Sequence, residues 1–235
     1  MNFVYFLIFS VVIFLLSLIS YEKFRTTTLY ALAIGGAVNA NFFHAGNYPI
    51  NCFGLPFGID SIIYSVFAFC VVVMFLKANK KEAYILMFSS VIAIMFSACM
   101  QLVADLFTKG SSLAIWQTFF CFCVSSAATV IAVCEMLEIL QKLKEKGLNQ
   151  YLLMVIGMAI VLFINSIIYY PIIVLINNTP ANLWQQLLTS VIGKAIGIVC
   201  AIGSLYLMSK LDIAIQKRKN KKEADKVAKN NETEN

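Results

Sequence analysis

The sequence predicts an all-α fold, a polytopic bundle of six or seven transmembrane helices. Of its 235 residues, 60% are hydrophobic and only 13% are charged, whereas soluble domains are about 45–50% apolar and about 25% charged. Apolar runs of about 18 residues or more, the length that a helix needs to cross a bilayer, recur along the whole chain. The lipid bilayer is therefore the first partner that the composition predicts.

Seven apolar segments are candidate membrane helices. The second is interrupted by Asn39, Asn41 and His44, so the sequence leaves open whether residues 28–45 span the membrane or re-enter it. The predicted segments are Phe3–Ser20, Thr28–Phe43, Ile59–Leu76, Ala83–Phe107, Leu113–Leu140, Tyr151–Ile176 and Leu183–Ser209.

Positive charges alternate between the loops that these segments define. Lys and Arg residues follow the first, third, fifth and seventh segments, and Lys109 is the only positive residue in the remaining loops. By the positive-inside rule this pattern predicts a multi-pass protein of the cell membrane, with its N-terminus outside and its C-terminus in the cytoplasm. Residues 1–215 form the membrane domain, and residues 216–235 form a basic, disordered tail. No base-stacking pattern accompanies its lysines, so we expect no nucleic-acid partner.

Motifs for metal binding and catalysis are missing. The chain has one histidine and no C-x-x-C pair, so we expect neither a metal nor a cofactor. It also lacks G-x-S-x-G, H-E-x-x-H and P-loop motifs, so we expect no enzyme. Carboxylates alone could still build an intramembrane enzyme. Glu135 and Glu138 share a helix face, and we interpret them as interfacial residues near Lys142, the alternative being a role in substrate or proton handling.

Lys194 is the most informative residue, because it lies inside the apolar run Leu187–Met208. A lysine at that depth costs about 2.5–3.5 kcal/mol and is tolerated where it faces a protein-lined or wet interior and has a function there. Other polar side chains are predicted near the same interior: Asn41, His44, Asp60, Gln101, Asp105 and Asn165. Together they suit a small polar solute, although any one amide could instead bond neighbouring helices to each other.

Small residues at four-residue spacing occur in two of the segments. Gly193, Gly197 and Ala201 follow this spacing in the last segment, and Ala31 and Gly35 follow it in the second. Such stripes allow two helix backbones to approach closely, so we predict a tight helix contact at each.

The C-terminal half of the chain resembles a known transporter family. The stretch Phe163–Pro171, with Asn165 and Ser166, is followed by Trp184, Leu187-Leu188 and Gly193-Lys194, and it is preceded by the small-residue run Ser125–Ala132. This order is similar to that of the queuosine precursor transporters, also called the vitamin uptake transporter family, in which an aspartate helix precedes a tryptophan and a helix with a central lysine. The asparagine Asn41 resembles an early asparagine of that family, and Asn165 stands where the family has its aspartate.

This resemblance implies an integral membrane transporter for a small polar solute, such as a queuosine precursor or a similar heterocycle. It implies that Asn41, Asn165 and Lys194 contact the solute. We expect Asp60, His44, Gln101 and Asp105 to belong to the same substrate-binding set, with aromatic walls from residues such as Phe43, Tyr169 and Trp184.

Two other classes remain open from the sequence. The chain could be the substrate-binding S component of an energy-coupling-factor transporter, with the small-residue stripe as the docking face for an ATPase module. It could also be a membrane sensor or assembly protein that transports nothing. Either class, or a homo-oligomer, is compatible with the composition, and the oligomeric state stays open.

Overall fold

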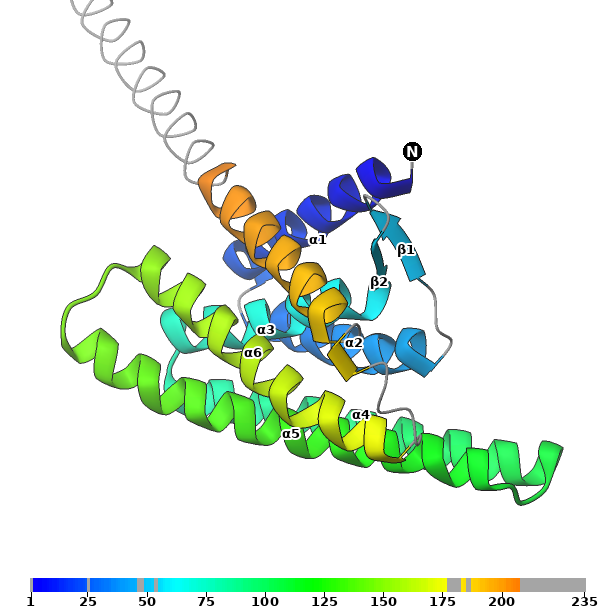
Figure 1. The fold of residues 1–235 in the computed structure, drawn as a ribbon. Helices are drawn as coiled ribbons and strands as arrows, with labels where there is room; N and C mark the ends of the chain where they lie inside the picture. The colour runs from blue at the N-terminus through cyan, green and yellow to red at the C-terminus, as the bar shows by residue number, and fades with distance from the viewer. Residues whose placement is uncertain are drawn as a thin grey trace, which may run out of the picture.

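Seven helices and one β-hairpin make up the part of the chain that the computed structural model describes, residues 2–24, 26–45, 49–52, 55–176, 183–184 and 187–207 (Figure 1). The last helix carries no label in Figure 1 and is drawn in orange; we call it the final helix. The helices are α1 (Asn2–Phe24), α2 (Thr26–Ala45), α3 (Ile59–Lys77), α4 (Lys80–Lys109), α5 (Leu113–Glu145), α6 (Gln150–Ile176) and the final helix (Leu187–Leu207).

The predicted helical bundle is confirmed, because each of the seven apolar segments forms a helix. Five of the helices are long and apolar enough to cross a membrane by length and composition: α3 to α6 and the final helix. The interrupted second segment forms one continuous helix of 20 residues, α2. These features define the architecture of a multi-pass membrane protein.

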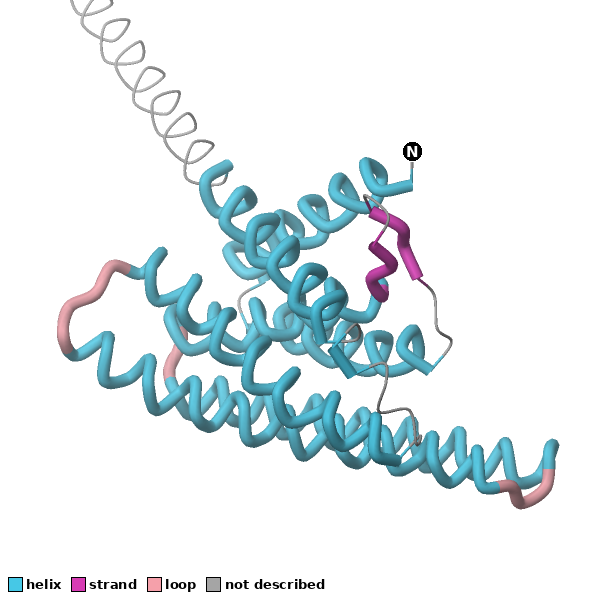
Figure 2. The backbone as a smooth tube through the Cα atoms, in the orientation of Figure 1, coloured by secondary structure: helices cyan, strands magenta, loops and turns pink. Residues whose placement is uncertain are grey.

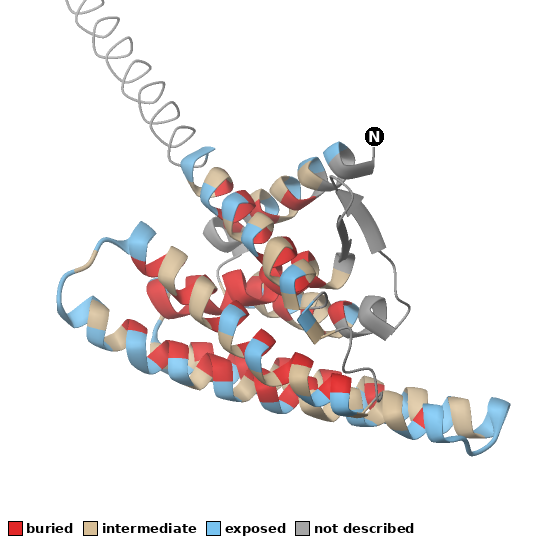
Figure 3. Cartoon of the chain, viewed as in Figure 1, coloured by how far each residue is buried: buried red, intermediate tan, exposed pale blue. Residues whose placement is uncertain are grey.

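Helices α3 and α4 show how the bundle is layered. In the apolar window of α3, 83% of the residues are buried, against 33% in α4. Figure 3 shows the buried residues gathered along the centre of the bundle. The outward face of α4 is a continuous apolar stripe of Ile85, Phe88, Ile92, Phe96, Met100, Val103 and Phe107, all exposed. Such a stripe suits contact with lipid, whereas α3 is enclosed by protein.

The small-residue stripe of the final helix forms the predicted tight contact. A Cβ atom added to Gly197 would lie 2.6 Å from the Cβ atom of Ser65 on α3, and Ala201 is 1% exposed. The other prediction, at Ala31 and Gly35, is wrong within the described residues: Ala31 is exposed and Gly35 has open space beside it. On α2 the neighbouring face makes the contact instead, with Gly36 close to the Ile63 carbonyl.

A short antiparallel hairpin connects α2 to α3. Its strands are β1 (Pro49–Cys52) and β2 (Leu55–Gly58), with Pro49 opposite Gly58 and Cys52 opposite Leu55. The Gly- and Pro-containing residues directly before α3 form strand β2, which pairs with β1.

Among the residues with described side chains, the connections place most of the basic ones at one end of the bundle. Figure 2 shows the loops at residues 78–79 and 146–149 at one end, and the loop at residues 110–112 at the other. Lys77, Lys80, Lys81 and Lys146 adjoin the first two loops, and Lys109 adjoins the third. We call the end of the bundle that carries the loops at residues 78–79 and 146–149 the basic end. The predicted tail, with its boundary at residue 215, lies outside the described residues.

Candidate functional site

A polar cavity lies inside the bundle, where α3, α5, α6 and the final helix meet beside α2. Its volume is about 40 Å³, room for roughly three water molecules. It lies toward the end opposite the basic end, since α3 starts and α6 finishes there. The described lining residues are Ala40, Asp60, Ser61, Tyr64, Ser125, Asn165, Tyr169, Tyr170 and Lys194.

Lys194 is buried at the wall of this cavity, with 6% of its surface exposed. Its ammonium donates to Ser166 Oγ at 2.6 Å, to the Leu162 carbonyl at 3.3 Å and to Asn165 Oδ1 at 3.4 Å. These three acceptors satisfy the three N–H groups of an ammonium, but all are neutral. The positive charge is therefore held in place without being cancelled by these bonds.

Aromatic rings complete the surroundings of the ammonium. Lys194 Nζ lies 5.5 Å from the ring centroid of Tyr64 and 5.9 Å from that of Tyr170. Tyr170 in turn packs edge-on against Tyr169, with 5.3 Å between the ring centroids. Ring faces at these distances attract a cation, and more strongly where water is excluded.

Thr129, which is not among the lining residues, forms hydrogen bonds with cavity residues of α3, α5 and α6. Its hydroxyl donates to the Ser125 carbonyl at 2.8 Å, so its oxygen is left to accept from the Tyr64 hydroxyl at 2.9 Å and from Asn165 Nδ2 at 3.5 Å. A hydroxyl has one proton and two lone pairs, and all three are used here. The bond to Nδ2 turns the Asn165 amide so that its oxygen faces Lys194.

The predicted site residues divide into three groups. The structure brings Asp60, Asn165, Tyr169 and Lys194 together at the cavity. Gln101, Asp105 and Trp184 do not line it. The first two lie on the half of α4 farther from the basic end, where Asp105 pairs with Lys109 at 2.7 Å, and Trp184 is 80% exposed. The side chains of Asn41, His44 and Phe43, at the end of α2, lie outside the described residues.

Sequence reasoning missed Ser61, Tyr64, Ser125, Thr129 and Tyr170. A signal for some of them exists, because polar residues spaced i and i+4 occur on three helices: Asp60 with Tyr64, Ser125 with Thr129, and Asn165 with Tyr169. Residues at this spacing lie on one face of a helix. Three such faces in a membrane bundle indicate a shared polar interior.

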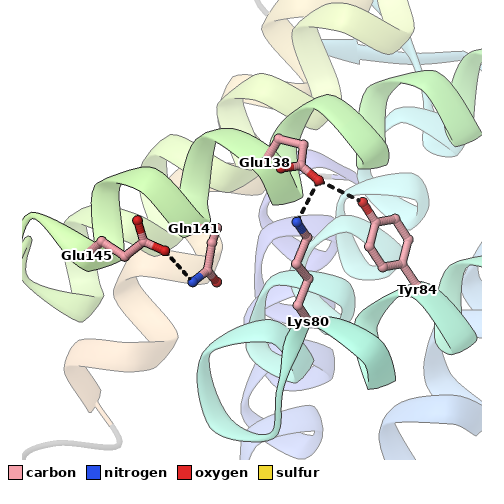
Figure 4. A network of polar contacts seen from close by, with 5 residues as sticks. All are labelled: Lys80, Tyr84, Glu138, Gln141 and Glu145. Carbon is pink, nitrogen blue, oxygen red and sulfur yellow. Dashed lines mark hydrogen bonds and ion pairs between the residues drawn. The ribbon is translucent and has the colours of Figure 1, made fainter.

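The other predicted carboxylates lie at the basic end, where polar contacts tie the helices together (Figure 4). Glu138 of α5 accepts from Lys80 at 2.5 Å and from Tyr84 at 3.4 Å, both on α4. Glu82 accepts from Tyr30 of α2 at 3.0 Å, and Glu135 is exposed. Glu138 thus pairs with Lys80 rather than resting near Lys142 alone.

Comparison with other proteins adds no relative: no family model, no curated protein and no solved structure matches the chain. Among the described residues, no three His, Cys, Asp or Glu side chains cluster as metal ligands would. The fold and the site together define a multi-pass membrane protein with a polar cavity that a lysine and an aspartate line.

Proposed function

We propose that this chain is an integral membrane transporter that takes up a small polar solute, with the cavity around Lys194 as its binding site. One observation carries the proposal: a buried ammonium, coordinated by neutral acceptors, faces a cavity that four helices line with polar side chains. A charge at membrane depth is costly, so a chain keeps it where it has a function.

The position of the cavity supports uptake. Asp60 lies in the first turn of α3, and Tyr169 and Tyr170 lie near the end of α6, so the cavity is displaced toward the end opposite the basic loops. By the positive-inside rule that end faces outward. On the way to the basic end the helices are tightly packed, and a Cβ atom on Gly157 would lie 2.8 Å from Leu140 and 2.9 Å from Val72. A solute would thus enter from outside and meet a closed inner half.

The resemblance to queuosine precursor transporters suggests a heterocyclic solute. Three tyrosines line the cavity, and aromatic rings offer flat surfaces for stacking. The cavity of about 40 Å³ has room for roughly three water molecules, fewer heavy atoms than a deazapurine has, so a bound ring would extend beyond it unless the walls move apart. Alternating access between the two ends would supply that movement.

The competing S-component hypothesis loses one of its arguments. The stripe of Gly193, Gly197 and Ala201 was the candidate docking face for an ATPase module, but Gly197 packs against Ser65 of α3 within the same chain. The stripe is therefore used inside the bundle.

The test is uptake of radiolabelled deazaguanine precursors by cells that lack their own route for them. The wild-type chain should support uptake, Lys194→Ala should abolish it, and Lys80→Ala should leave it intact at matched membrane expression. Lys80 is the matched control because it is a lysine of the same bundle that lies far from the cavity and pairs with Glu138. No uptake with well-expressed wild type would reject this solute, and uptake that appears only with an added ATPase module would favour the S component.

A further inference from the structure

We infer that the basic end of the bundle binds an anionic phospholipid, whose headgroup contacts lysines and whose acyl chains lie along the apolar stripe of α4. The observation behind it is that exposed lysines gather at this end, where the stripe begins. We call Lys77, Lys81, Lys144 and Lys146 the lysine patch. The inference does not depend on the proposed transport, because none of these lysines lines the cavity.

The lysine patch is assembled from three helices. Lys77 is the last residue of α3, and Lys81 lies in the first turn of α4, four residues further along the chain. Lys144 of α5 reaches the same place, since its Nζ lies 5.2 Å from the ring centroid of Phe75 in the last turn of α3. Lys146 begins the loop after α5, which Figure 2 shows at the same end of the bundle. The fold thus brings lysines from three helices to one end.

The charge of the lysine patch is not cancelled by ion pairs within the described part of the chain. The ion pairs there involve other lysines, Lys80 with Glu138 and Lys109 with Asp105. Two more glutamates of the basic end accept hydrogen bonds from neutral side chains, Glu82 from Tyr30 and Glu145 from Gln141 (Figure 4). The patch therefore presents its ammonium groups to an anion from outside the bundle.

Lys81 lies on the same helix face as the apolar stripe of α4. Ile85, Phe88 and Ile92 follow it at steps of four, three and four residues, the spacing of one helix face, and all three are exposed. At about 1.5 Å of rise per residue, the stripe from Ile85 to Phe107 is about 33 Å long, which matches the hydrocarbon core of about 30 Å. Lys81 lies about 6 Å beyond the start of the stripe, at the depth of the lipid headgroups.

An anionic phospholipid fits both parts of this surface. Its phosphate oxygens accept from the ammonium groups, and its acyl chains cover the apolar stripe. Lysine binds a phosphate as a point charge, so the lysine patch should select net negative charge more than headgroup shape. A zwitterionic lipid brings a cation beside its phosphate and gains less. An acidic protein segment in water would contact the lysines alone and leave the stripe without a partner.

The experiment measures lipid binding to the purified, delipidated full-length protein in a neutral detergent, by native mass spectrometry. The probes are phosphatidylglycerol and phosphatidylcholine with identical acyl chains, so that only the headgroup differs. Glycerophosphoglycerol, the phosphatidylglycerol headgroup without acyl chains, serves as a competitor. We expect phosphatidylglycerol to bind at least tenfold more tightly than phosphatidylcholine. We expect an equal concentration of the competitor to displace none of it.

Variants that remove single charges test where the lipid binds. Lys81→Gln should weaken phosphatidylglycerol binding about fivefold, and Lys77→Gln together with it about 25-fold, whereas Lys81→Arg should bind as the wild type does. Lys109→Gln, which removes an exposed lysine at the opposite end, should change nothing. The basic segment after residue 215 is the same in every variant, so its own attraction for anionic lipid cancels in the comparison.

Several results would overturn the inference. Equal binding of the two lipids by the wild-type protein would show that headgroup charge is not recognised, and equal losses in Lys81→Gln and Lys109→Gln would show that the lysine patch is not the site. Displacement of the lipid by glycerophosphoglycerol would assign the patch to a free phosphate anion. Binding of polyglutamate with the same dependence on Lys77 and Lys81 would assign it to an acidic protein. Both lysines are exposed, so their variants should fold, and the wild-type comparison of lipids decides independently.

Discussion

Lys194 and Lys80 are two lysines of one membrane bundle in opposite circumstances. Lys194 is 6% exposed, and its ammonium donates to three neutral groups, Ser166 Oγ, the Leu162 carbonyl and Asn165 Oδ1. Lys80 lies at the basic end, where the carboxylate of Glu138 neutralises it at 2.5 Å. In the function proposed above, the first arrangement presents the ammonium to a solute, whereas the second ties α4 to α5. The proposed binding group and the structural group thus differ in their partners and not in residue type.

The largest difference between the two lysines should appear in transport. Removing the Lys194 ammonium by Lys194→Ala should lower uptake at least tenfold, because a hydrogen bond to a charged group contributes about 1.5–3 kcal/mol. Initial rates of solute uptake over a concentration series measure it, with Lys80→Ala as the control. Equal losses in both variants would show that Lys194 acts through folding, and the comparison would fail.

The next largest effect should come from the helix contact beside Lys194. Gly197→Ala should destabilise the protein by about 1–3 kcal/mol, the usual cost of overpacking, because its Cβ atom would meet the Ser65 Cβ atom at 2.6 Å. The melting temperature in detergent measures it. Adding Ser65→Gly should restore stability, and Gly203→Ala, on the same helix with open space beside it, should cost nothing. A stable single variant would mean that the final helix does not pack on α3 this closely.

A smaller effect should follow from the hydroxyl behind the cavity. Thr129→Val removes the acceptor shared by Tyr64 and Asn165 and should cost about 1 kcal/mol, since cavity water can replace part of what is lost. It should also weaken solute binding, because the Asn165 amide is no longer oriented toward Lys194. Thr129→Ser keeps the hydroxyl and should restore both properties. Normal solute binding by the Thr129→Val variant would show that Thr129 does not help to orient the site.

The smallest effect should belong to the exposed pair. Glu138→Gln should leave uptake unchanged and lower the melting temperature only slightly, because exposed ion pairs contribute little. The contact is salt-dependent, so raising the salt concentration should bring the wild type toward the variant. If Glu138→Gln instead lowered uptake, the contact between Lys80 and Glu138 would be part of the transport cycle. Lys80 could then no longer be contrasted with Lys194 as a purely structural lysine.

Much of the fold could be predicted, because membrane thickness fixes helix length. The fourth segment was expected over Ala83–Phe107 and forms Lys80–Lys109, and the sixth was expected over Tyr151–Ile176 and forms Gln150–Ile176. Polar residues at helix ends account for the differences. Asn79, for example, lies four residues before the predicted apolar run begins at Ala83, and it caps α4 by accepting from the Glu82 amide.

The candidate site was less predictable, because the depth of a residue along a membrane helix does not say toward which neighbour its side chain points. Lys194 and Asn165 stand out in apolar runs, and both line the cavity. Gln101 lies at a comparable depth in α4, yet it lies away from the cavity, since the rotation of a helix depends on its neighbours. Tyr64 and Ser125 are marked only by their i, i+4 spacing from Asp60 and Thr129, a weak signal because single hydroxyls commonly bond between membrane helices.

The enclosure of α3 has a consequence for biogenesis. This helix is made third, but the partner that covers Ser65 is Gly197 of the final helix, which leaves the ribosome more than a hundred residues later. Membrane helices insert first and associate afterwards, so Ser65 of α3 lacks this cover until the final helix has been made. A chain cut before the final helix should therefore be recognised by membrane quality control and degraded.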